Sequence, residues 1–411
     1  MKVLISSIGS RGDVQPIIAL GVELKMLGHD ATLCVAPNFK EWVESFGLTC
    51  LPIGPDLKQL TGGMAPRNPP KLTAEQKSQL AAQAVRSQFP VLTAAAKDCD
   101  LIVAGGALQL ATRSVAEAFR IRYVFAAYCP AVLPSSTYPP ARMGTHHPQS
   151  LPAEAIRLLW KEDEESWNGL FRETLNEERA KLGLPSVDSV PRHIFTDRPW
   201  LAADASIGPA GSTTEMQITQ TGAWLLHDPR PLPDQVEEFL SRGAPPVYFG
   251  FGSMRSTEGN SRVLIEAARA LGLRSIISQG WGNLGPIDDG NDCLMVDDLS
   301  HEKLFARVAA VVHHGGAGTT TAAARAGKPQ VLVPHHYDQY FWAHRVQALG
   351  IGVAGPARDD LTASAMTAAL HAATRPDIAT EAQAFAGRVQ VHGARIAANR
   401  LWKNPNARDP R

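Results

Sequence analysis

The chain has 411 residues and 44% of them are hydrophobic, so it is long enough for two domains with sizeable cores. Lysine plus arginine and aspartate plus glutamate both total 40, and this zero net charge argues against a nucleic-acid-binding protein. The 5 scattered cysteines form neither a zinc motif nor a disulfide framework. No signal peptide or apolar run of about 20 residues is evident, so we expect a cytoplasmic protein without an integral membrane segment.

Short β-branched runs alternate with helical patterns in the first half, which is typical of parallel α/β structure. A helix is expected to begin near Pro16 and to stop at Gly28. Thr73 and Gln76 have the spacing of a capping box that opens a long helix. The expected strands of this half are 2–7, 31–35, 101–104 and 123–127.

The same alternation restarts after a proline-rich segment at 228–233, which stiffens the chain and ends regular structure. We therefore predict an α/β protein with two Rossmann-like parallel-sheet domains. Their expected extents are 1–219 and 235–385, with a linker at 220–234 and a C-terminal helical segment, 386–411, that crosses back to the first domain. The expected strands of the second half are 247–251, 275–278, 293–296, 310–313 and 330–333.

Two short glycine motifs each follow the first strand of a half. Gly9-Ser10-Arg11-Gly12-Asp13 lies where open α/β sheets bind ligands, although its spacing is not that of the dinucleotide fingerprint. A structural turn with Asp13 stabilised near a helix N-terminus is an equally good interpretation. Phe249-Gly250-Phe251-Gly252-Ser253 offers an amide and a hydroxyl to a phosphate, or forms a plain strand-to-helix turn.

The strongest motif is His313-His314-Gly315-Gly316-Ala317-Gly318-Thr319-Thr320, between an expected strand and a helix expected at 322–326. Backbone amides, hydroxyls and an imidazole at a helix N-terminus make an anion cradle, which predicts a diphosphate site.

His335-His336-Tyr337-Asp338-Gln339 follows the next expected strand. A metal site is one interpretation, but adjacent strand residues face opposite ways, and phosphate explains the glycine-rich turn better. The alternatives for Asp338 and Gln339 are a pair that binds sugar hydroxyls and a helix N-cap at Asp338. Trp281 is interpreted either as a residue stacked near a base or as a buried core residue.

Together these motifs resemble family 1 glycosyltransferases of the GT-B fold, especially the bacterial enzymes that glycosylate glycopeptides of the vancomycin group. The resemblance extends over about residues 1–400. Sterol and rhamnosyl transferases share part of it, including Gly12-Asp13-Val14-Gln15-Pro16, so the acceptor class stays open.

The resemblance implies an inverting transfer from a UDP- or TDP-sugar, with no cofactor and no metal. Asp13 matches the general base, while Asp338 and Gln339 match the sugar-binding pair. The contact with the pyrimidine base of the nucleotide corresponds to the main chain at Val296, with Trp281 as a second candidate. The residues that match diphosphate contacts are Ser10, Ser253, His314, Gly316, Gly318 and Thr319.

The proline-rich loop from Cys129 to Pro152 suggests a bulky, largely apolar acceptor, because its aromatic and methionine side chains offer adaptable contacts. The candidate acceptor contacts are Tyr128, Leu133, Tyr138 and Met143, and coverage of the domain's own core is the alternative. The loops 54–72 and 129–150 correspond to the variable acceptor region of the family.

The expected partners are a nucleotide sugar and a hydrophobic small molecule, for a monomer or homodimer that binds no nucleic acid. The competing functions are a sterol or lipid glycosyltransferase, an epimerase acting on a nucleotide sugar, and a catalytically silent nucleotide-sugar-binding partner.

Overall fold

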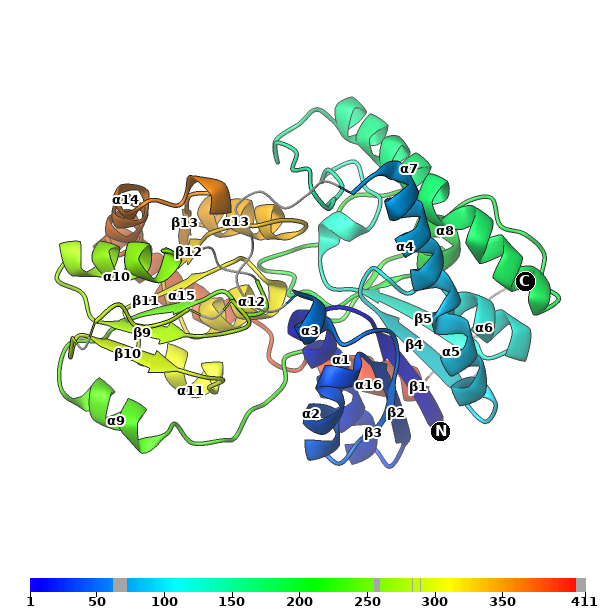
Figure 1. The fold of residues 1–411 in the computed structure, drawn as a ribbon, viewed down its shortest axis with the longest axis horizontal. Helices are drawn as coiled ribbons and strands as arrows, with labels where there is room; N and C mark the ends of the chain where they lie inside the picture. The colour runs from blue at the N-terminus through cyan, green and yellow to red at the C-terminus, as the bar shows by residue number, and fades with distance from the viewer. Residues whose placement is uncertain (62–71, 255–258, 283, 289, 404–411) are drawn as a thin grey trace.

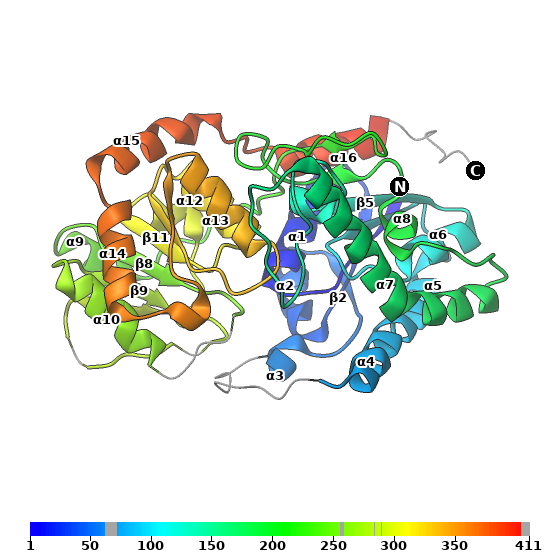
Figure 2. The ribbon, with the colours of Figure 1, turned by 90° about the horizontal axis from the view of Figure 1, so that it is seen from above.

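The computed structural model describes residues 1–61, 72–254, 259–282, 284–288 and 290–403. Within these ranges the chain forms two α/β units side by side, each built around one parallel sheet (Figure 1). The predicted fold class is therefore confirmed. Figure 2 shows the same two units from above, with the last helix lying on the first unit.

The first sheet has the order β3-β2-β1-β4-β5-β6-β7 among the described residues, and every neighbouring pair is parallel. Its central strands are buried on both faces, as their continuous apolar sequences require. The strands β3, β6 and β7 were not predicted, and β6 and β7 have only 2 residues each. The strands are β1 (Lys2–Ser7), β2 (Asp30–Val35), β3 (Thr49–Pro52), β4 (Leu101–Gly105), β5 (Arg122–Ala127), β6 (Trp200–Leu201) and β7 (Thr219–Gln220).

The second sheet has the order β10-β9-β8-β11-β12-β13 in the described chain, again entirely parallel. Every strand predicted for this half begins and ends within one residue of its predicted bounds. Among the described strands of this sheet, only the edge strand β13 was not predicted. The strands are β8 (Val247–Gly250), β9 (Ser275–Ser278), β10 (Cys293–Val296), β11 (Ala310–His313), β12 (Gln330–Leu332) and β13 (Gly352–Ala354).

Helices cover both faces of each sheet, and the long helix α7 packs beside α4 at the edge of the first unit (Figure 1). The first unit contains α1 (Arg11–Met26), α2 (Lys40–Ser45), α3 (Leu57–Thr61), α4 (Ala74–Arg86), α5 (Gln88–Ala96), α6 (Thr112–Phe119), α7 (Ala153–Lys181) and α8 (Val190–Phe195). The second contains α9 (Asp234–Ser241), α10 (Asn260–Ala270), α11 (His301–Phe305), α12 (Ala317–Arg325), α13 (Gln339–Ala348), α14 (Ala363–Ala373) and α15 (Pro376–Phe385), followed by α16 (Gly393–Lys403).

Two helices begin earlier than the sequence predicted. Helix α1 starts at Arg11, so Pro16 lies inside the helix rather than at its start. Helix α12 starts at Ala317 instead of residue 322, which places part of the glycine-rich motif in its first turn. In both cases a glycine-containing turn leads straight from a strand into a helix, so amides at the helix start face the edge of the sheet. The capping box is confirmed, because Thr73 and Gln76 exchange bonds of 2.9 and 3.2 Å.

The two units share apolar contacts. Helix α16 packs on α1, and its residues Ala397 and Leu401 are fully buried in the core around Ile5 and Ile17. A second core extends from the first sheet into the second unit, where it includes Trp342 of α13. The cleft between the units is thus bounded by elements that pack directly on each other.

Candidate active site

Asp13 lies in the first turn of α1, directly after β1, and faces the gap between the units. Its Oδ2 accepts bonds from the backbone N–H of Ser10 at 2.8 Å and from the Ser10 hydroxyl at 3.1 Å. A Cβ at Gly9 would lie 2.2 Å from Oδ2, and one at Gly106 would lie 3.1 Å from Oδ1. The two glycines therefore make room for the carboxylate, which Ser10 holds in a fixed orientation.

Burial raises the pKa of Asp13 from 3.8 to about 6, although its bonds with Ser10 lower the pKa in part. Removing water disfavours the charged form of a carboxyl group, and two bonds are too few to reverse this effect. The carboxylate is consequently ionised at neutral pH and is a stronger base than an ordinary aspartate. Such a group is suited to accepting a proton during a reaction.

The opposite wall of the cleft is the turn between β11 and α12. His313 is fully buried, and its ring bonds to the Gln330 side chain at 3.0 Å and accepts from the Gly315 N–H at 3.1 Å. His313 therefore fixes the turn. The ring of His314 lies against Gly316 instead, where an added Cβ would be 2.6 Å from its Nε2.

Burial and the neighbouring His313 and His336 lower the pKa of His314 to about 3. A neutral imidazole beside the start of α12 is able to donate a hydrogen bond without the cost of burying a charge. The first amides of α12 have no partner within the helix, and the positive end of the helix dipole favours an anion there. Gly316, Gly318 and Thr319 all lie at this helix start and line the cleft.

Asp338 and Gln339 lie where β12 leads into α13. Asp338 is the N-cap residue of α13, but its side chain makes no capping bond and instead accepts from the indole N–H of Trp342 at 2.9 Å. The Oε1 of Gln339 accepts from the backbone N–H groups of His335 and His336 at 2.7 and 3.2 Å. Gln339 therefore shapes the loop, while Asp338 keeps a carboxylate at the cleft.

The pKa of Asp338 is raised from 3.8 to about 7, mainly by burial and in smaller part by the nearby negative charge of Asp13. The bond from Trp342 acts in the opposite direction and lowers this pKa. Two carboxylates with raised pKa values thus face one space, one from each unit.

This space is a cavity of about 360 Å³, which we call the Asp13 cavity. It contains all three groups described above, with Asp13 on one side and His314 and Asp338 on the other. Its apolar wall includes Val132, which belongs to the loop predicted to contact an acceptor. It also includes three side chains that the sequence analysis did not single out: Leu108, Trp167 and Met254.

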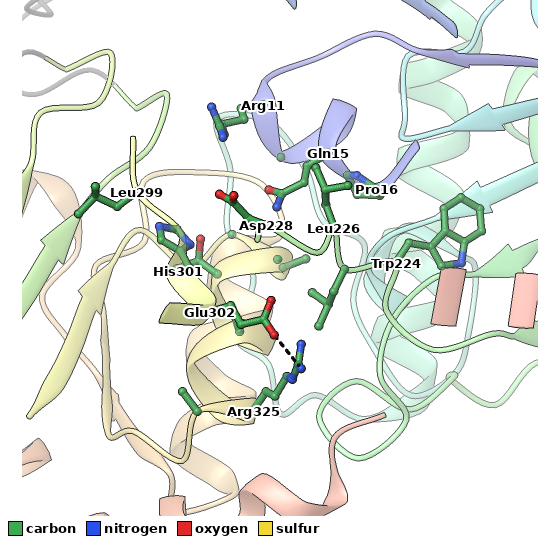
Figure 3. Close-up of a pocket in the computed structure, with 18 of the residues that line it drawn as sticks. Arg11, Gln15, Pro16, Trp224, Leu226, Asp228, Leu299, His301, Glu302 and Arg325 are labelled. Carbon is green, nitrogen blue, oxygen red and sulfur yellow. Dashed lines mark hydrogen bonds and ion pairs between the residues drawn. The ribbon is translucent and has the colours of Figure 1, made fainter. Parts of the chain in front are cut away.

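A second cavity of about 340 Å³, the Arg11 cavity, adjoins the first, and both are lined by Gly12, His314, Gly316 and Ala317. Figure 3 shows Arg11 and Gln15 facing His301 and Glu302 across it, with Glu302 paired to Arg325. Arg11 also forms an ion pair with Asp298 at 2.9 Å, which joins the two units at the mouth of the cavity. Neither Asp298 nor His301 was among the predicted site residues, because no motif surrounds them.

Three predicted donor contacts do not line either cavity. Val296 is buried, and its carbonyl accepts from the N–H of Gln279 at 3.0 Å. Trp281 stacks on Phe39 of the first unit, with ring centroids 5.8 Å apart, so it acts here as a contact between units. Ser253 lies in the turn after β8 and lines neither cavity.

Side chains of the loop 129–152, which follows β5, lie partly in the core and partly at the Asp13 cavity. Leu133 is 1% exposed, packs in the core and does not line the Asp13 cavity, which favours the alternative that it covers the domain's own core. Tyr138 packs edge-on against Phe341, while Met143 is 68% exposed and lines the Asp13 cavity. Tyr128 is largely buried, with its ring at the cavity wall. Of the loop 54–72, residues 62–71 lie outside the described residues.

Family models match both halves of the chain. Residues 3–134 match the glycosyltransferase family 28 N-terminal domain. Residues 290–389 match the erythromycin biosynthesis protein CIII-like C-terminal domain.

Curated relatives match almost the whole chain. Glycosyltransferase GtfE of Amycolatopsis orientalis is 42% identical over 407 residues, which cover 98% of this chain and 97% of the relative. The chain belongs to this glycosyltransferase family. The vancomycin aglycone glucosyltransferase of the same organism is 41% identical over 98% of this glycosyltransferase and 97% of its own length. The dTDP-epi-vancosaminyltransferase of that organism is 36% identical over 93% and 92% of the two chains.

Solved structures agree with the fold of this glycosyltransferase. The glycotransferase of kitacinnamycin matches with a TM-score of 0.73 at 17% identity, covering 98% of each chain. The calicheamicin glycosyltransferase CalG4 matches with a TM-score of 0.70 at 19% identity, covering 100% of this chain and 99% of the other. The enzyme therefore has the GT-B arrangement that the sequence motifs predicted.

The described ranges contain neither a clustered metal site nor a membrane-spanning helix. No group of three or more histidine, cysteine, aspartate or glutamate side chains there is placed to hold a metal ion. No helix in the same ranges combines the length and apolar character needed to cross a membrane.

Proposed function

We propose that this glycosyltransferase transfers a sugar, with inversion, from a TDP- or UDP-sugar to a hydroxyl group of a bulky, largely apolar natural product. The observation that carries the proposal is that Asp13, His314 and Asp338 line one cavity between the two units. A base from the first unit and an anion-binding helix start from the second then face the same reacting centre. A single displacement needs this arrangement, because the attacking hydroxyl and the leaving group lie on opposite sides of the anomeric carbon.

The proposed base is Asp13. Both bonds from Ser10 end on Oδ2, so Oδ1 is the oxygen that takes the proton of the acceptor hydroxyl. The raised pKa of about 6 brings this carboxylate close to the pH at which it works, which favours proton transfer in the transition state.

The proposed diphosphate site is the start of α12. As the bond to the sugar breaks, negative charge grows on the leaving diphosphate. The neutral ring of His314, the free amides of α12 and the Thr319 hydroxyl supply donors fixed in place before the reaction. The nucleoside would occupy the adjoining Arg11 cavity, and Asp338 would accept a bond from a sugar hydroxyl. The donors on the protein remove the need for a metal ion.

The proposed acceptor is a glycopeptide aglycone or a compound of similar size and polarity. Two relatives carry vancomycin or vancosamine in their names, and the exposed wall of the Asp13 cavity is apolar, with Leu108, Met143 and Trp167. Aromatic and methionine side chains bind large acceptors with few directional demands.

The test is mass spectrometry of reactions that pair TDP- and UDP-sugars with glycopeptide aglycones, sterols and simple sugars. We expect product mass increases of one sugar with the aglycones, together with release of nucleoside diphosphate. Preferred transfer to sterols or simple sugars would contradict the proposed acceptor. Conversion of the donor sugar without any acceptor would instead indicate an epimerase.

A further inference from the structure

Trp342 connects the donor side of the cleft to the first unit. It lies four residues after Asp338 on α13, so the two side chains share one helix face. The indole N–H donates to Asp338 Oδ2 at 2.9 Å, and Trp342 is 1% exposed. This buried bond holds Oδ2 of Asp338, a residue that lines the Asp13 cavity, and leaves Oδ1 available for another partner.

The far edge of the same indole ring packs on the first unit. A Cβ added at Gly208 would lie 2.8 and 2.9 Å from two ring carbons of Trp342 and 3.3 Å from Pro130. The next turn of α13 is also held by the first unit, since Arg345 donates to the Ile207 carbonyl at 2.7 Å. The position of the Trp342 ring therefore depends on how closely the two units pack.

We propose that Trp342 is a positioning residue that holds Asp338 for the donor sugar only while the first unit packs against its ring. The inference rests on the proposed role of Asp338 as a sugar-binding residue. It adds that the packing of the two units controls how Asp338 is oriented toward the donor sugar. Without the first unit against it, the indole is free to leave the orientation in which its N–H reaches Oδ2, and Asp338 then has several orientations instead of one.

The experiment compares the affinity for TDP-glucose with that for TDP, and for UDP-glucose with UDP, by calorimetry. For whichever nucleotide binds more tightly, the ratio of the affinity for the nucleotide sugar to the affinity for the nucleoside diphosphate isolates the contribution of the sugar. We call this value the ratio. Trp342→Phe keeps an aromatic side chain, although a smaller one, and removes the N–H. We expect the ratio to fall about tenfold while the affinity for nucleoside diphosphate stays unchanged. Gly208→Ala crowds the ring from the first unit, and it should lower the ratio in the same direction.

The matched control is Phe385→Leu, which removes aromatic bulk from the same shared core without touching Asp338. We expect it to lower the melting temperature while leaving the ratio unchanged. An equal fall of the ratio in this control would show that Trp342 has only a structural role. An unchanged ratio in Gly208→Ala would contradict the dependence on packing between the units.

Asp338→Ala separates the inference from the function on which it rests. If this variant keeps the wild-type ratio, the proposed sugar contact of Asp338 fails. If the ratio falls in Asp338→Ala but not in Trp342→Phe, only the proposed role of Trp342 fails. When Trp342→Phe is added to Asp338→Ala, the ratio should not fall further, because Trp342 acts through the carboxylate that Asp338→Ala has already removed.

A pH series gives a second readout that core packing would not move. The indole bond lowers the pKa of Asp338, so its loss in Trp342→Phe should move the pH dependence of the ratio upward from about 7. Among the described residues, the titratable groups around Asp338 include Asp13, Cys129 and Tyr337, and His314 and His336 line the same cavity. Burial raises the pKa values of Cys129 and Tyr337 well above the ordinary range and lowers those of His314 and His336, so of these five groups Asp13 is the one that titrates close to pH 6.

Discussion

Replacing Asp13 with asparagine should abolish most activity and at the same time stabilise the protein. Asparagine has nearly the same shape and keeps an oxygen for the bond from the Ser10 N–H, which is 2.8 Å long in the wild type. It has no basic oxygen, so it cannot take the proton of the acceptor. We expect kcat to fall by about 100-fold or more, with little change in affinity for nucleoside diphosphate.

The structure also sets the pH dependence of the wild-type enzyme. With a pKa of about 6, Asp13 is half ionised at pH 6 and about one-tenth ionised at pH 5. The value of kcat/KM should therefore fall about tenfold per pH unit below pH 6 with a non-acidic acceptor. The variant should lack this acid limb, because its amide does not titrate.

The stability change has the opposite sign to the activity change. The folded state holds the Asp13 proton more tightly than the unfolded state does, so ionisation of this group lowers the free energy of unfolding as pH rises from 3.8 to about 6. The shift in pKa corresponds to about 3 kcal/mol, and because Asp13 keeps some contact with solvent we expect about 1–2 kcal/mol. The Asp13→Asn variant avoids this cost. Its free energy of unfolding should therefore exceed that of the wild type above pH 6, and the difference should disappear below pH 4.

The assays are steady-state kinetics between pH 5 and 8 and thermal unfolding at pH 4 and 7.5. Near wild-type turnover of the variant with a non-acidic hydroxyl acceptor would refute the assignment of Asp13 as the base. A wild-type acid limb far below pH 6 would refute the argument that burial raises its pKa. A variant that is less stable than the wild type at pH 7.5 would show that the Ser10 bonds outweigh burial.

Three further predictions concern the other walls of the cleft. His314→Ala removes a neutral donor at the start of α12, so the rate should fall about 10²-fold and calorimetry should show weaker binding of TDP or UDP; unchanged nucleotide affinity would count against this role. Met143→Ala should raise the acceptor KM several-fold without changing donor KM or melting temperature, because the side chain is 68% exposed and lines the Asp13 cavity; an unaltered acceptor KM would remove Met143 from the site. Exhaustive EDTA treatment should leave activity intact, and a loss restored by one divalent ion would revive a metal site at the two histidine pairs.

Local sequence was sufficient for most of the two sheets. Buried parallel strands need continuous apolar runs such as Lys2–Ser7 and Ala310–His313, and the glycines after them need a turn. These features depend on neighbours in the chain, so the strand positions and the turns at the strand ends follow from the pattern. The helix starts were less well predicted, because glycine and proline are poor helix formers in isolation, yet Pro16 and Gly318 both lie within helices.

The side chains that complete the cleft depended on contacts between distant parts of the chain. Trp281 stacks on Phe39 of the other unit, and Leu133 lies in the core although its loop also supplies the exposed Met143. The raised pKa of Asp13 likewise comes from burial by surfaces that its own sequence motif does not contain. The sequence by itself determined which residues can turn, donate or accept at each strand end, because these properties are local. The tertiary structure decided which of them meet in one water-poor cavity, because burial and packing arise only when two units of the chain enclose the same space.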